Sequence, residues 1–104
     1  MHFTSYLDNG QLTVALTGEI DHHRAKDCIQ AITAKIEAYT PVVCILDFQE
    51  VTFVDSSGIA VVINALRAMT RIEGQLILSG IAPQPMKVFR ASGIDQLVQI
   101  REAV

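Results

Sequence analysis

Residues 42–48 (VVCILDF) form an almost unbroken apolar run that begins with two β-branched valines. Such a run is typical of a strand that is buried on both faces, as in the centre of a parallel sheet. We interpret residues 49–54 as a connection from this strand to residues 55–58 (DSSG). Apolar residues then recur at helical spacing as far as Met69, and Gly74 follows, so a helix is expected to begin within DSSG.

A β-hairpin is predicted before the buried run. Residues 2–7 are expected to form a short first strand. Residues 8–10 (DNG) supply a turn, because Asn and Gly tolerate positive φ. Residues 11–17 alternate between apolar and more polar side chains, which is the pattern of a half-buried strand that pairs with the first.

An amphipathic helix is predicted between the hairpin and the buried run. Gly18 is expected to break the preceding strand, and Asp21 is a suitable N-cap for the helix. Apolar residues follow at helical spacing, and the helix is expected to end before Pro41. These apolar positions are Ala25, Cys28, Ile29, Ile32, Ile36 and Tyr39.

The last third of the chain continues the alternation of strands and helices. Residues 75–79 (QLILS) are expected to form a strand, and residues 97–101 a final one. Pro83 or Pro85 opens a third helix, since proline suits a first helical turn, and Gly93 is a suitable end for it. The element order predicts an α/β fold whose sheet is largely parallel after the opening hairpin.

Length, composition and charge argue against several classes of protein. The 104 residues fit a single domain, 1–104, and 50% of them are hydrophobic, which argues against a disordered chain. The net charge of -3, with acidic and basic residues interspersed, argues against direct binding of nucleic acid. The first six residues lack the features of a signal peptide, and the apolar stretches are far too short to span a membrane. We therefore expect a cytoplasmic protein with no membrane association.

Cysteines and histidines do not indicate a metal site. Cys28 and Cys44 both lie in apolar patterns and are expected to be buried, reduced thiols. His22 and His23 are adjacent, so they do not share a helical face as a two-histidine metal site would require. Nothing resembles a P-loop, and we expect neither a metal nor a cofactor.

The DSSG motif places two hydroxyls where a strand gives way to a helix. Asp and Ser side chains can cap the unpaired N–H groups at such a junction, but three capping residues in a row exceed that need. A phosphate there adds a charge of about -1.5 to -2. The helix N-terminus favours this charge and Asp55 disfavours it, so the fold is expected to survive. A partner packed over the phosphate would be strongly destabilised, because an unpaired buried charge costs several kcal/mol.

A second motif, residues 18–23 (GEIDHH), also lies between a strand and a helix. A turn, an N-cap and two solvated histidines would explain it structurally. However, loops at the carboxyl ends of strands share one edge of an α/β sheet, where binding sites form. We therefore expect Asp21 and Ser56 to lie on one surface.

Together these motifs resemble the anti-sigma-factor antagonists of the STAS family, particularly those of the sporulation type. The matching stretches are residues 16–23 (LTGEIDHH), 53–58 (FVDSSG) and, more loosely, 88–93 (VFRASG). The resemblance covers nearly the whole chain. It implies a mixed sheet of four or five strands with helices packed mainly on one face.

The resemblance also implies a function without enzymatic activity. Relatives of this kind bind, when unphosphorylated, a partner that is both an anti-sigma factor and a serine kinase, and so release the sigma factor. The partner then phosphorylates the antagonist, and a serine phosphatase resets it. The phosphoacceptor falls on Ser56, the serine directly after the aspartate, with Ser57 as the alternative assignment. The implied partner-binding residues are Asp21, His22, Asp55, Ser56, Ser57 and Gly58.

The chain departs from the family pattern in two places. Ala60 stands where relatives often carry a second glycine, which puts the details of partner docking in doubt. The chain stops at Val104, which trims the last helix found in some relatives. A second function stays open within the family, that of a scaffold or sensor component in a regulatory complex without a sigma factor. A neighbouring kinase gene and a sigma-factor gene would favour the first function.

Two other classes of protein fit the sequence less well. An esterase would use Ser56 or Ser57 as its nucleophile and His22 or His23 as its base. A nucleophile elbow needs glycine two residues before and after the serine, and neither serine has both. A receiver-like protein would accept a phosphate on Asp47, but residues 6–10 lack the acidic pair that receivers carry after their first strand.

Overall fold

The computed structural model describes residues 2–102. The expectation that the chain lacks a last helix concerns the end at Val104, which lies outside the described residues. Five strands, three α-helices and one short 3-10 helix follow one another. They are β1 (His2–Asp8), β2 (Gln11–Ile20), α1 (His22–Tyr39), β3 (Val43–Val54), α2 (Ser57–Arg71), β4 (Gln75–Ser79), α3 (Pro83–Ser92), η1 (Ile94–Gln96) and β5 (Gln99–Arg101).

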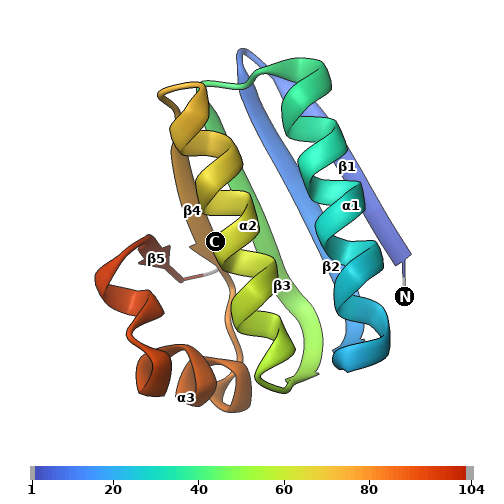
Figure 1. Cartoon of the computed structure of the whole chain (residues 1–104), viewed down its shortest axis with the longest axis vertical. Helices are drawn as coiled ribbons and strands as arrows, with labels where there is room; N and C mark the ends of the chain where they lie inside the picture. The colour runs from blue at the N-terminus through green and yellow to red at the C-terminus, as the bar shows by residue number, and fades with distance from the viewer. Residues whose placement is uncertain (1, 103–104) are drawn as a thin grey trace.

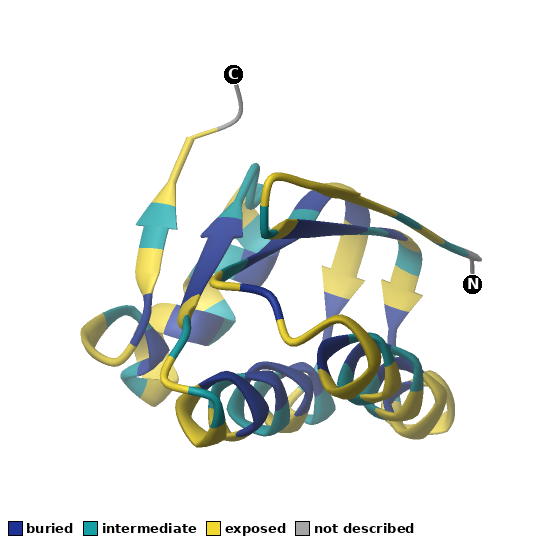
Figure 2. Ribbon diagram, turned by 90° about the horizontal axis from the view of Figure 1, so that it is seen from above, coloured by how far each residue is buried: buried dark blue, intermediate teal, exposed yellow. Residues whose placement is uncertain are grey.

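The strands form one mixed sheet in the order β1-β2-β3-β4-β5. β1 and β2 are antiparallel, as the predicted hairpin requires, whereas each later pair of neighbouring strands is parallel. Figure 1 shows α1 and α2 side by side across the sheet, with α3 near the N-terminal end of α2. Figure 2 shows α1 and α2 on the same side of the sheet. The predicted α/β fold class is confirmed.

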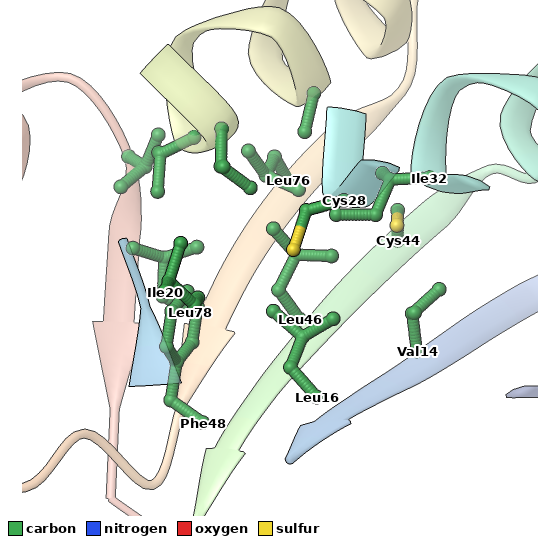
Figure 3. Packing of buried hydrophobic residues seen from close by; sticks show 14 of the residues in the cluster. Val14, Leu16, Ile20, Cys28, Ile32, Cys44, Leu46, Phe48, Leu76 and Leu78 are labelled. Carbon is green, nitrogen blue, oxygen red and sulfur yellow. The ribbon is translucent and has the colours of Figure 1, made fainter. Parts of the chain in front are cut away.

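The core lies between the sheet and these helices. Alternate residues of β2 (Leu12, Val14 and Leu16) point into it and are fully buried. Cys28 of α1 and Cys44 of β3 are buried there too, in agreement with the sequence (Figure 3). Burial raises the pKa of the Cys28 thiol to about 11, with a smaller contribution from Asp27, and burial raises that of Cys44 to about 12. Both groups are therefore protonated at neutral pH.

Two sequence-based expectations about β2 and β3 were wrong. β2 does not break at Gly18 but continues to Ile20, with register shifts on either side of Gly18, whose φ is +101°. Residues 49–54 are not a connection but the second half of β3. Both strands are longer than expected because the extended part of β2 and the extended part of β3 supply each other's backbone hydrogen-bond partners. Where the pairing of β2 and β3 is irregular, buried and exposed side chains do not alternate regularly, so the sequence lacks the pattern by which a strand is recognised.

The helix ends follow local sequence signals more closely. Asp21 caps α1, Pro83 stands in the first turn of α3, and Gly93 ends α3 with a φ of +83°. The last strand is shorter than expected, because η1 occupies Ile94–Gln96 and β5 begins only at Gln99. Among the described helices, none has the length and hydropathy needed to cross a membrane.

Candidate functional site

The two motifs lie side by side, as the sequence analysis expected. β2 and β3 are neighbours, and Ile20 pairs with Val54 at their carboxyl ends. The backbone N–H of Asp55 then donates to the carbonyl oxygen of Ile20 at 3.2 Å. The GEIDHH and DSSG motifs therefore lie at the same end of the sheet, where β2 passes into α1 and β3 passes into α2.

Asp55 joins the two loops through its carboxylate. Oδ1 accepts a hydrogen bond from the N–H of Ser57 at 2.7 Å, and Oδ2 accepts one from the N–H of His22 at 3.1 Å. Ser57 and His22 are the first residues of α2 and α1. One half-buried carboxylate thus satisfies an N–H group at the start of both helices, where the positive ends of two helix dipoles meet.

Asp21 caps α1 from within its own loop. Its Oδ1 accepts hydrogen bonds from the N–H groups of His23 and Arg24, both at 3.0 Å. The imidazoles of His22 and His23 are exposed and meet edge to face, with ring centroids 5.2 Å apart. Since Asp21 and Asp55 both bind backbone at the start of α1, this corner of the molecule carries two ordered carboxylates.

Ser56 stands at the N-cap position of α2 without capping it. Its backbone is helical (φ -60°, ψ -21°), and its side chain makes no hydrogen bond to the cap. Asp55 takes that role instead. Ser56 is exposed, whereas Ser57 is half-buried in the first turn of the helix. The Ser56 hydroxyl is therefore the more accessible of the two, and capping of α2 does not use it.

Gly58 follows the two serines in the first turn of α2 and is buried. A Cβ at this position would stand 2.9 Å from Cβ of Val54, closer than ordinary van der Waals contact. Glycine therefore lets the first turn of α2 pack directly onto the end of β3. Gly58 faces the interior, whereas Ala60, two residues later in α2, is exposed.

Gln84 is a site residue that the sequence analysis missed. β4 pairs with β3 only as far as Asp47, so within residues 2–102 no strand lies beside Val54 on that side. The Gln84 side chain fills this place, because Nε2 donates to the Val54 carbonyl and Oε1 accepts from its N–H, both at 2.9 Å. The only local hint was a polar residue between Pro83 and Pro85. The contact ties α3 to the strand that carries DSSG.

A family profile and individual relatives of this chain point to the same protein family. The STAS domain profile matches residues 3–104. An anti-sigma F factor antagonist from Lysinibacillus sphaericus is 32% identical over 95 residues, which cover 90% of this chain and 81% of that protein. An anti-sigma-B factor antagonist from Listeria monocytogenes is 23% identical over 94 residues, which cover 90% of this chain and 82% of that protein.

The fold also matches solved structures. The unphosphorylated form of the anti-sigma factor antagonist SpoIIAA superposes with a TM-score of 0.85 at 27% identity, over 99% of this chain and 89% of that one. A sulfate transporter family protein from Wolinella succinogenes shares the fold, with a TM-score of 0.75 at 18% identity over 91% of this chain and 79% of that one. The profile match and the Lysinibacillus relative together establish that the chain belongs to the STAS domain family.

Proposed function

We propose that the protein is an anti-sigma-factor antagonist that phosphorylation of Ser56 switches off. In its unphosphorylated form it binds an anti-sigma factor that is also a serine kinase, and the sigma factor is released. Phosphorylation by that partner ends binding, and a serine phosphatase restores it. The role needs no catalytic residue in this chain and places the protein in the cytoplasm. The observation that carries the proposal is the exposed Ser56 hydroxyl, which takes no part in capping α2.

The local electrostatics suit a switch that leaves the fold intact. A helix N-terminus stabilises a nearby anion by about 0.3–1 kcal/mol. The Asp55 carboxylate opposes a phosphate on Ser56 by about 1 kcal/mol per unit charge at 4 Å in water. For a phosphate charge of about -1.5 to -2 the repulsion is about 1.5–2 kcal/mol, which exceeds the helix contribution by roughly 1 kcal/mol. The N–H groups of His22 and Ser57 are already bound by Asp55. Phosphorylation should therefore destabilise the free protein by only roughly 1 kcal/mol, which a folded domain tolerates.

A partner would respond to the same phosphate quite differently. The proposed partner surface consists of Asp21, His22, Asp55, Ser56 and Ser57. Gly58, which the resemblance also implied, is buried against Val54 and is not part of this surface. Phe53, on β3 just before this motif, is 39% exposed and offers an apolar contact next to these polar groups. A partner that covers Ser56 would have to bury a dianion beside two carboxylates, which costs several kcal/mol unless the partner supplies cations. Binding is lost while the fold persists.

The test is phosphorylation of the purified protein by the host's candidate anti-sigma kinase with ATP and magnesium. Intact mass and site mapping should find one stable phosphate on Ser56. Ser56→Ala should take up none, whereas the matched control Ser57→Ala should be modified like the wild type. Phosphate on Ser57 alone would move the switch to that residue.

Measuring how tightly variants bind the same kinase tests whether a negative charge at position 56 weakens the complex, independently of the phosphorylation reaction. Ser56→Ala should hold the partner persistently, and Ser56→Asp should bind it poorly. Equal binding by both variants would rule out a switch based on charge.

A second role stays open because the STAS fold is shared with a sulfate transporter family protein. In this role the protein would be a scaffold or sensor component of a complex without a sigma factor. A folded protein that neither binds nor is modified by a competent anti-sigma kinase would favour it.

A further inference from the structure

Figure 1 shows α3 and β5 at the edge of the sheet away from the hairpin. Residues of both elements, and of the segment between β4 and α3, line a groove. Its main hollow has a volume of about 450 Å³, and its apolar lining comes from Ile81, Met86 and Ile100. A neighbouring hollow of about 420 Å³ shares Ile81 and Met86 and extends the apolar surface to Pro83. We call the two together the α3–β5 groove. The main hollow has a mixed polar and apolar lining, whereas the neighbouring hollow is mainly apolar; both volumes lie in the range of about 300–1,000 Å³ that is typical of small-molecule sites.

Positive charge gathers at this groove although the whole chain is acidic. Arg90 lines both hollows, Arg101 lines one end and Lys87 the other. These are three of the eight Lys and Arg residues in a chain of net charge -3. Glu102 is the one acidic residue among those that line the described groove. Arg90, Arg101 and Lys87 are all exposed, so their charged groups remain available to a ligand.

We propose that the α3–β5 groove binds an amphipathic carboxylate, such as a medium-chain fatty acid. Guanidinium groups match the planar geometry of a carboxylate, and Arg90 and Arg101 line the same hollow as the apolar side chains. The carboxylate binds at these two arginines. The alkyl chain then follows Ile81 and Met86 towards Pro83, where the methylene stem of Lys87 covers it.

This site is separate from the proposed phosphorylation switch. None of the residues that line the groove belongs to DSSG or GEIDHH. The proposal does not depend on a sigma-factor role, and it adds a ligand that the protein would sense or carry. Gln84, which holds the end of β3, lies in the same helix as Met86 and Arg90, so the two sites share one structural element.

The test is an NMR titration of the labelled full chain with decanoate. Saturable shifts are expected at amides of the groove, including those of Ile81, Met86 and Ile100. Decanol has the same chain without the charge and should bind at least tenfold more weakly. Arg90→Gln and Arg101→Gln should each weaken decanoate binding about tenfold, the effect of one lost charge-assisted hydrogen bond.

Matched controls make the outcome decisive. Arg67→Gln removes an exposed arginine of α2 outside the groove and should bind decanoate like the wild type. Ser56→Ala should also bind it normally, which keeps this result independent of the switch. The proposal is overturned if decanoate causes no saturable shift, if decanol binds equally well, or if Arg90→Gln and Arg101→Gln behave like Arg67→Gln.

Discussion

Replacing Asp55 should destabilise both helices at the functional site at once. In Asp55→Ala the N–H groups of His22 and Ser57 lose the carboxylate that accepts their hydrogen bonds at 3.1 and 2.7 Å. Loss of one capping side chain costs about 0.5–2 kcal/mol. Because one carboxylate serves two helices and water partly replaces it, we expect a loss of about 2 kcal/mol. Asp55→Asn keeps one acceptor oxygen and should lose about half as much.

Urea denaturation followed by circular dichroism measures this loss, with linear extrapolation to water. A change of about 2 kcal/mol corresponds to a fall in melting temperature of roughly 8–16 °C for a domain of this size. Hydrogen exchange gives a local readout, since the amides of His22 and Ser57 should exchange faster in Asp55→Ala.

The matched control is Asp27→Ala, which removes an exposed carboxylate from α1 and should change stability by less than about 0.5 kcal/mol. If Asp55→Ala is no more destabilising than Asp27→Ala, the double cap contributes nothing and the reasoning fails.

Three further predictions concern the packing and the core. Gly58→Ala should destabilise by about 1–3 kcal/mol, because its Cβ would stand 2.9 Å from Cβ of Val54. The penalty should shrink in a Val54→Gly background, which lacks that Cβ, and an unchanged penalty would contradict a steric cause. Gln84→Ala should lower the free energy of unfolding by about 1–3 kcal/mol, because the N–H and carbonyl of Val54 lose their hydrogen-bond partners. Hydrogen exchange of the Val54 amide should accelerate, and unaltered exchange would show that water replaces the side chain. Folding raises the thiol pKa from 9.0 to about 11 for Cys28 and about 12 for Cys44, so the unfolded chain ionises first. The free energy of unfolding should therefore fall as the pH rises from about 9 to 11, and a Cys28→Ala, Cys44→Ala double variant with the same slope would refute this origin.

The parts of the fold that were predictable have local causes. The turn at residues 8–10, the cap at Asp21 and the helix end at Gly93 each depend on the chemistry of a few neighbouring residues. The meeting of the two motifs was predictable as well, because parallel strands place their carboxyl ends at the same edge.

The parts that were missed depend on contacts between distant residues. The second half of β3 is a strand because β2 runs on beside it, and neither extension is evident without the other. Asp55 was recognised as a possible cap at the DSSG junction, yet its carboxylate also accepts a hydrogen bond from the N–H of His22, 33 residues away. Gln84 reaches Val54 across 30 residues, which no periodicity or motif reveals.

The strand order also bears on how the protein is made. Because the order β1-β2-β3-β4-β5 repeats the order of synthesis, each strand that leaves the ribosome finds its partner at the edge of the sheet already formed. In the described sheet no strand has to insert between two others, although each parallel pair still joins residues that the intervening helix separates in sequence. Both motifs of the site are complete once Arg71 has been added. Gln84 is made later, so α3 closes onto the end of β3 only after the serine site has been built.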